Sequence, residues 1–306
     1  MKLSFTKMQG CANDYIYLDC RASGVPADIA ALAQRLSARH FSVGADGIIC
    51  ICAPVTPGAD GRMRIFNADG SEAQMCGNGV RCFTKFLVDH GYVDPNAGSY
   101  IADTKRGPLP ISFELNDQGL MSLASVDMDE PILDPEKVPA NLPAEGCAPN
   151  GSAFIKEASV ESPWGNFEFT CVSMGNPHAV CFLDDIEELP ADWFLSDEKT
   201  LDTFDLNRIG AFFESNKVFP AKTNVEFIVP AEDGLHMRVY ERGCGETLAC
   251  GTGACASLVA AVLTGRSERT NKVNLRGGTL NITWQDNNHV LMTGPATQAF
   301  TGTIEI

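Results

Sequence analysis

Two cysteines of this chain stand in turns that are nearly copies of each other. Cys76 begins the sequence Cys-Gly-Asn-Gly, and Cys250 begins Cys-Gly-Thr-Gly, 174 residues further on. Each turn ends a longer repeat with an arginine, a short apolar run and a glutamate at the same offsets: RIFNADGSEAQMCGNG (64–79) and RVYERGCGETLACGTG (238–253). Because glycine has no side chain, both turns let a ligand approach the backbone closely. The duplication predicts two half-sites, each built around a thiol.

A thiol at the start of a helix can perform acid–base chemistry. The segments after the cysteines, Asn78 to His90 and Thr252 to Thr264, have helical length and apolar content. A helix start offers unpaired N–H groups that bind a carboxylate. Its field favours thiolate over thiol, so we expect a lowered pKa for each cysteine. Two such turns acting on one amino acid predict that one thiolate removes the α-proton while the opposite thiol delivers another, which inverts the centre without a cofactor.

The rest of the chain must place these turns in two similar units. A length of 306 residues favours two domains, and the duplication strengthens that expectation. We expect a first domain over residues 1–130, completed by a strand from 294–306, and a second over 131–293. The proline-rich stretch from Asp129 to Gly151 has the composition of a linker. Many short strands against one central helix in each half favour the α+β class.

Charge and composition exclude several classes of partner. The net charge is −16, which argues against binding to nucleic acid or to an anionic membrane. The N-terminal sequence MKLSFTKMQG has no apolar signal region, so we expect a cytoplasmic protein whose twelve cysteines are reduced. The sequence contains neither CxxC nor HExxH, and we expect no bound metal.

Five motifs resemble those of the diaminopimelate epimerase family and occur in that family's order. They are GCANDY (10–15), FNADGSEAQMCGNGVRC (66–82), SMGNPHAV (173–180), TNVEF (223–227) and YERGCGETLACGTGACA (240–256). The resemblance implies two pseudo-symmetric α+β domains, each a mixed strand barrel around a central helix, with the active site between them. It also implies epimerisation of LL-2,6-diaminopimelate to the meso isomer without pyridoxal phosphate, for lysine and peptidoglycan synthesis. A homodimer is compatible with it.

The resemblance assigns roles to residues that match the family's motifs. The acid/base pair is Cys76 and Cys250. The reacting carboxylate would be held at the two helix starts by Gly77, Asn78, Gly251 and Thr252. The distal amino acid group would be bound by Asn67, Asn176, Asn224 and Arg242. Asn13 would line the site, and His178 and Glu241 would support the reacting centre, with Glu241 also contacting substrate. Two positions depart from the pattern: Cys11-Ala12 replaces the usual glycine, and Gly47 stands where some members have a binding glutamine.

Three other functions use some of the same residues. A cysteine hydrolase would need one thiol and a base such as His178, which leaves the second cysteine turn unexplained. A module that only binds amino acids would make both sulfurs incidental. A proline or hydroxyproline racemase shares the two-thiol chemistry, but a cyclic monoacid gives no purpose to Arg242.

Overall fold

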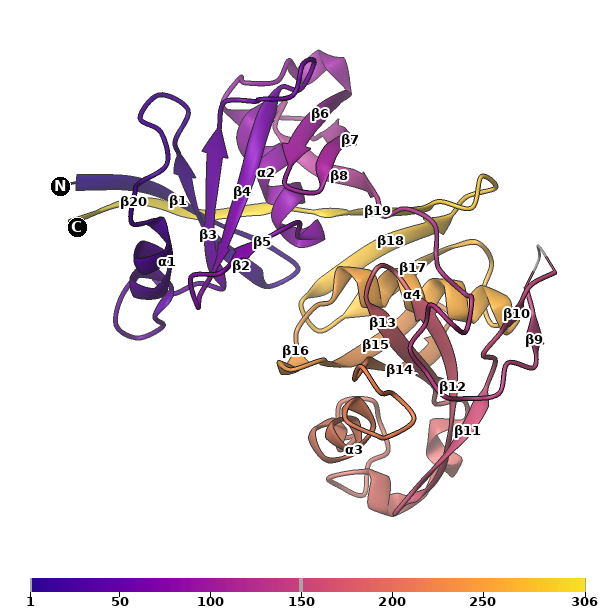
Figure 1. Cartoon of the computed structure of the whole chain (residues 1–306). Coiled ribbons are helices and arrows are strands. Elements are labelled where there is room, and N and C mark those ends of the chain that lie inside the picture. The colour runs from indigo at the N-terminus through magenta and orange to yellow at the C-terminus, as the bar shows by residue number, and fades with distance from the viewer. Residues whose placement is uncertain (1, 149–150, 306) are drawn as a thin grey trace. The chain divides into compact units, whose positions relative to one another are not determined.

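The computed structural model describes residues 2–148 and 151–305, which form two compact units (Figure 1). Unit 1 comprises Met1–Asp127 with Thr293–Ile306, and unit 2 comprises Met128–Met292. In each unit, strands surround one long helix, which confirms the predicted α+β class with two similar domains. Within the described residues, no helix combines the length and apolar character that crossing a bilayer requires.

Unit 1 is a mixed sheet that packs against the helix following Cys76. The strands pair in the order β20-β1-β2-β3-β4-β6-β7-β8, and β5 pairs with β4; β2/β3 and β4/β6 are parallel. The helix α2 contacts β1, β2 and β8 through a buried stripe that includes Val80, Phe83 and Leu87. The elements are β1 (Lys2–Gly10), β2 (Asn13–Asp19), α1 (Ile29–Ser37), β3 (Gly47–Cys52), β4 (Gly61–Asn67), β5 (Glu72–Ala73), α2 (Gly77–Asp89), a 3₁₀ turn (Pro95–Ala97), β6 (Ser99–Thr104), β7 (Gly107–Leu115), β8 (Met121–Asp127) and β20 (Thr297–Glu305).

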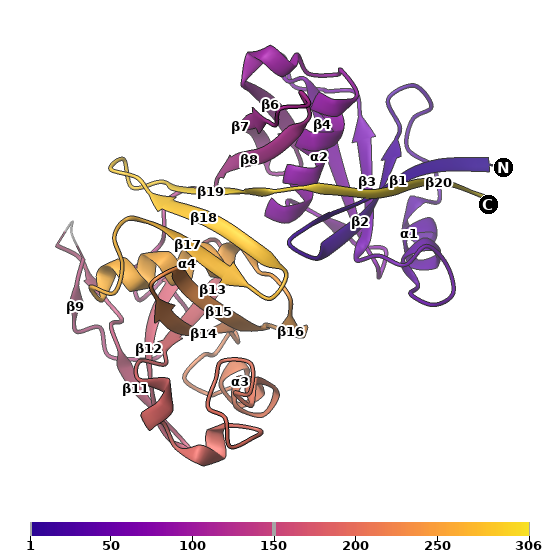
Figure 2. The ribbon, with the colours of Figure 1, turned by 180° about the vertical axis from the view of Figure 1, so that it is seen from behind.

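Unit 2 repeats this plan around the helix following Cys250. Its strands pair in the order β11-β12-β13-β14-β15-β17-β18, with β16 against β15. The helix α4 is apolar on almost all sides and contacts β12, β13, β17 and β18, and both views show it among these strands (Figure 2). The elements are β9 (Gly146–Cys147), β10 (Ala153–Phe154), β11 (Ala158–Ser162), β12 (Gly165–Ser173), β13 (Pro177–Phe182), 3₁₀ turns (Ile186–Glu188, Ala191–Trp193), α3 (Leu206–Glu214), β14 (Asn224–Ala231), β15 (Gly234–Glu241), β16 (Gly245–Thr247), α4 (Gly251–Leu263), β17 (Thr270–Leu275), β18 (Gly278–Trp284) and β19 (Val290–Pro295), whose last residues belong to unit 1.

Strand register identifies equivalent positions in the two units. Parallel strands β2 and β3 pair Tyr17 with Ile49, and parallel strands β13 and β14 pair Val180 with Glu226. The next residue along each second strand, Cys50 or Phe227, lies opposite the arginine that opens the repeat, Arg64 or Arg238. Ile49 therefore occupies in unit 1 the place of Glu226 in unit 2. Counting back along the preceding strands makes Tyr15 equivalent to His178, and Asn13 equivalent to Asn176.

The stretch predicted as a linker, Asp129 to Gly151, instead packs on unit 2. Residues 149 and 150 lie outside the described part of the chain. The Ile132 N–H donates to the Ser173 carbonyl at 2.8 Å, and Val138 is buried in the core of unit 2. The linker prediction was wrong because proline content signals an irregular backbone, while the apolar residues between the prolines decide that this backbone is fixed against the core.

Candidate active site

In unit 1, Cys76 is the N-cap of α2. The backbone N–H of Gly79 donates to the Cys76 sulfur at 3.3 Å, as it would to the oxygen of a capping serine. The Cys76 thiol in turn lies 3.4 Å from Oδ1 of Asn13. The sequence prediction that Cys76 stands at a helix start is confirmed, and the sulfur lies between a backbone N–H and an amide oxygen.

A short loop between β1 and β2 holds Asn13 in place. The side-chain amide nitrogen of Asn13 donates to Oδ2 of Asp46 at 2.7 Å, which leaves the amide oxygen of Asn13 facing the Cys76 thiol. Cys11 and Ala12 adopt left-handed backbone angles, with φ of 53° and 65°. The Ala12 N–H donates to Oε1 of Gln9 at 2.8 Å and ties the loop down. The loop thus keeps a shape that suits glycine, although neither residue here is glycine.

The other predicted residues of unit 1 lie at strand and helix ends. Gly77 and Asn78 form the first turn of α2, and the buried Oδ1 of Asn78 has no hydrogen-bond partner among the described residues. Asn67 ends β4, and its amide donates to Oγ of Ser71 at 3.0 Å. At Gly47 an added Cβ would lie 2.2 Å from the Phe66 carbonyl oxygen. No side chain fits at this position, so a glutamine contact with substrate is excluded here.

The expected lowering of the Cys76 pKa is wrong for this structure. Burial raises the pKa of the Cys76 thiol, and it outweighs the opposing effects of the Gly79 N–H, the Tyr15 hydroxyl and Arg81. Sequence reasoning missed Tyr15, a buried residue on the same face of β2 as Asn13, two positions further on. The two-residue spacing from Asn13 in a predicted strand could have indicated that Tyr15 lies on the same face as Asn13.

In unit 2, Cys250 caps α4 in the same way. The Gly253 N–H donates to the Cys250 sulfur at 3.4 Å, and the Thr252 hydroxyl lies 3.5 Å from that sulfur. Gly251 and Thr252 form the first turn of α4. The prediction of a second capping thiol is confirmed, and the matching distances show that the repeat is preserved in three dimensions.

A hydrogen-bonded row of side chains leads away from Thr252. The Asn176 amide donates to the Thr252 hydroxyl oxygen at 3.3 Å, and its Oδ1 lies 3.2 Å from Nε2 of His178. Nδ1 of His178 lies 2.7 Å from Oε1 of Glu226. Sequence reasoning missed Glu226, although a lone carboxylate inside the apolar run NVEFIV was a visible signal.

Burial and two nearby carboxylates act on the pKa of the Cys250 thiol. Burial raises the pKa of the Cys250 thiol well above its usual range, and the charges of Glu241 and Glu226 raise it further. Burial also raises the pKa of Glu241, whose carboxylate accepts a hydrogen bond from the Thr247 hydroxyl. Burial and the two carboxylates thus outweigh the Thr252 hydroxyl and the Gly253 N–H, which act in the opposite direction, and the predicted lowering was wrong here too.

Asn224 and Arg242 form a separate pair in unit 2. The Arg242 backbone N–H donates to Oδ1 of Asn224 at 2.9 Å, and the Asn224 amide donates to the Pro177 carbonyl at 2.8 Å. Asn224 is buried, and both the oxygen and the nitrogen of its side-chain amide form hydrogen bonds within the protein. Asn224 therefore fixes the loop that carries Arg242. Nη1 of Arg242 donates to the Ala221 carbonyl at 3.2 Å, and no described carboxylate pairs with this guanidinium.

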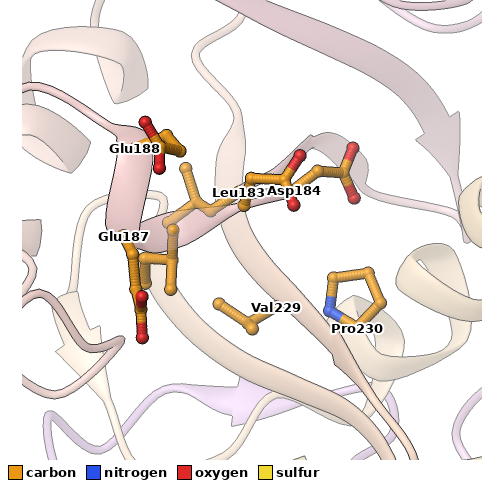
Figure 3. A pocket seen from close by; sticks show the side chains of 8 residues that line it. Leu183, Asp184, Glu187, Glu188, Val229 and Pro230 are labelled. Carbon is orange, nitrogen blue, oxygen red and sulfur yellow. The ribbon is translucent and has the colours of Figure 1, made fainter.

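A surface hollow of about 470 Å³ in unit 2 is built from other residues. It is lined by 183–188 with Val229 and Pro230, and Figure 3 shows the carboxylates of Asp184, Glu187 and Glu188 around it. Its lining includes neither the capping cysteine nor any of the predicted site residues. The acidic hollow and the start of α4 are therefore separate features of unit 2.

Comparison with known proteins places these features in a family. The family model described as diaminopimelate epimerase matches residues 5–133 and 170–299. A diaminopimelate epimerase of Leptospira biflexa is 40% identical over 310 residues and one of Acetivibrio thermocellus is 43% identical over 308, each alignment covering 99% or more of both chains. Among solved structures, a PhzF-family phenazine biosynthesis protein of Bacillus anthracis matches with a TM-score of 0.66 at 15% identity, covering both chains completely. That last likeness shows a shared fold.

Proposed function

Because the chain belongs to the diaminopimelate epimerase family, we propose that it interconverts LL- and meso-2,6-diaminopimelate with Cys76 and Cys250 as the proton-transfer groups. The product serves lysine and peptidoglycan synthesis. The observation that carries the proposal is the repeated capping thiol: each sulfur accepts from the backbone N–H three residues on, at 3.3 Å in one unit and 3.4 Å in the other.

The reaction needs one thiolate and one thiol on opposite faces of the α-carbon. The thiolate takes the α-proton, and the electron pair of the broken C–H bond passes into the adjoining carboxylate. The opposite thiol then gives its proton to the other face, so the centre is inverted and the two sulfurs have exchanged roles. The total number of protons is unchanged, and no cofactor takes part.

Stabilisation of the carbanion is the demanding part of this reaction. Each capping turn begins a helix, α2 with Gly77 and Asn78 in unit 1 and α4 with Gly251 and Thr252 in unit 2, and N–H groups at a helix start stabilise negative charge that develops on a bound carboxylate. Such preorganised donors lower a barrier by several kcal/mol, roughly 3 for a single donor. The unpartnered amide oxygen of Asn78 suits the substrate ammonium, because a buried acceptor gains a hydrogen bond there.

Arg242 is the proposed receptor for the distal carboxylate. A guanidinium binds a carboxylate in a fork of two hydrogen bonds, and no described acidic residue competes for this one. Asn67, with Asn176, would receive the distal amino acid group, while Asn224 acts through the loop that it holds. His178 and Glu241 would support proton transfer at Cys250. A cytoplasmic location follows from the prediction made on the N-terminal sequence, and a homodimer is compatible with the resemblance.

Exchange of the α-hydrogen in deuterated water tests the proposal directly. The protein should place deuterium at the α-carbon of diaminopimelate, which neither a cysteine hydrolase nor a binding module needs to do. Cys76→Ala and Cys250→Ala should each lower epimerisation by roughly 10²- to 10⁴-fold, the usual contribution of an acid or base. Cys147→Ala, at an exposed cysteine, is the matched control and should leave the rate unchanged. Near-normal turnover in either of the first two variants would refute the two-thiol assignment.

A further inference from the structure

A buried carboxylate–imidazole pair lies behind the site in unit 2. Glu226 and His178 both have 0% of their surface exposed, and their facing atoms Oε1 and Nδ1 are 2.7 Å apart. Two acceptors would repel each other at this distance, so one hydrogen lies between Oε1 and Nδ1. The second oxygen of Glu226, Oε2, has no partner among the described residues. Burying such an oxygen costs stability, so the pair is poorly explained as a support of the fold.

This pair is connected to the Cys250 sulfur. With Nδ1 directed at Glu226, the imidazole ring is fixed and its Nε2 faces the Asn176 amide at 3.2 Å. That amide holds the Thr252 hydroxyl at 3.3 Å, and the hydroxyl lies 3.5 Å from the sulfur. An added Cβ at Gly253 would come within 2.7 Å of Oε1 of Glu226, so the carboxylate also lies directly against the first turn of α4. Glu226 thus fixes the row from one end, and the thiol lies at the other.

Unit 1 shows that the fold itself does not need a carboxylate at this place. The equivalent position on β3 is Ile49, and the equivalent of His178 is Tyr15. Asn13, the equivalent of Asn176, reaches the Cys76 thiol directly at 3.4 Å without an intervening hydroxyl. In unit 2, Asn176 is connected to the sulfur through the Thr252 hydroxyl. The imidazole of His178 and the carboxylate of Glu226 occur only beside this longer connection. The difference between the units therefore concerns the surroundings of the sulfur.

We propose that Glu226 is a positioning residue for the epimerisation: through His178 and Asn176 it fixes the Thr252 hydroxyl beside the Cys250 sulfur. This inference depends on the proposed function. It adds a residue that touches neither the substrate nor the reacting atoms, and that acts only through the orientation of those that do.

The test replaces the carboxylate without changing its size. Glu226→Gln keeps an oxygen that can accept from Nδ1, but it also allows the amide nitrogen to face the ring, so the orientation of His178 is no longer fixed. We expect kcat to fall roughly 10- to 100-fold, as for other residues that orient a catalytic group, with KM changed less than threefold. The urea midpoint should stay the same or rise. Asp233→Asn is the matched control, because Asp233 and His236 form a pair of the same 2.7 Å length on the surface of the same unit. That variant should keep the wild-type kcat.

Each outcome bears on one proposal. Wild-type protein that fails to exchange the α-hydrogen refutes the proposed function, whereas an active wild type with an equally active Glu226→Gln variant overturns only the positioning role. A loss of activity accompanied by an equal loss of folded protein would make Glu226 structural and also overturn it. A measurement on the wild type does not depend on the variant folding: ¹⁵N–¹H correlation spectra of the His178 ring should show a hydrogen on Nε2, which donates to Oδ1 of Asn176, and its absence there would contradict the inference.

Discussion

The repeated arginine–glutamate pair allows the same substitution to be made in two environments. In unit 1, Nε of Arg64 lies 2.8 Å from Oε1 of Glu72, and the two side chains are 30% and 26% exposed. In unit 2, Nε of Arg238 lies 2.8 Å from Oε1 of Glu246, but these side chains are only 6% and 14% exposed. We compare Glu72→Gln with Glu246→Gln, since glutamine keeps the size and removes the charge.

The expected costs differ because the two arginines differ in burial. An exposed ion pair contributes about 0–1 kcal/mol, which is the expected loss for Glu72→Gln. Removing one partner of a buried pair leaves an uncompensated charge and costs about 3–5 kcal/mol. Glu246 also accepts from Arg276 at 2.9 Å, but Arg276 keeps Asp202 at 3.6 Å, so Arg238 is the cation that loses its carboxylate partner. Arg238 keeps its bonds to the carbonyls of Leu201 and Phe204, which places Glu246→Gln near the lower end, at about 3 kcal/mol.

Native-state hydrogen exchange can measure the free energy of opening of each unit separately. The slowest amides of β4 and β15 report the free energy of opening of unit 1 and unit 2 respectively. Glu72→Gln should lower the free energy of opening measured in β4 by less than about 1 kcal/mol. Glu246→Gln should lower the free energy of opening measured in β15, and this loss should exceed the loss in β4 by roughly 2–4 kcal/mol. Equal losses in the two units would refute the reasoning that burial decides the cost.

Two further predictions concern the thiols and the loop beside Cys76. Burial raises the pKa of Cys76 and Cys250, so the unreactive thiol form of each persists to higher pH. Near roughly pH 7, iodoacetamide should alkylate both cysteines more slowly than the exposed Cys147. Near roughly pH 9, the alkylation rates of Cys76 and Cys250 should still rise about tenfold per pH unit. Mass spectrometry that finds either one labelled first at neutral pH would contradict this. Ala12→Gly relieves the backbone strain of an alanine in the left-handed region, so it should leave the free energy of unfolding in urea unchanged or raise it by up to about 1 kcal/mol. Ala33→Gly inside α1 is the control and should lower that free energy by at least about 1 kcal/mol. Similar losses in both variants would argue against strain at Ala12.

The sequence was sufficient to predict the two cysteine turns. Glycines, apolar spacing and a cap-like cysteine are local signals, and the helices they predicted begin within one residue of the observed Gly77 and Gly251. The pKa direction was not predictable, because the helix field is local while burial of each sulfur depends on strands far away in sequence. The role of Glu226 was hidden for a similar reason: its equivalence to Ile49 follows from strand register, which a single sequence does not show.

Strand β20 gives the chain an unusual order of folding during synthesis. β1 pairs with β20 from Lys2 to Gln9, yet the whole of unit 2 is translated between β8 and β20. At roughly 5 to 20 residues per second, a ribosome needs about 10 to 30 s to cover that interval. Until then the edge of β1 that β20 will cover is open, and such an edge invites pairing with other chains. The half that is made first is therefore the half that is completed last, and it depends most on protection while the nascent chain grows.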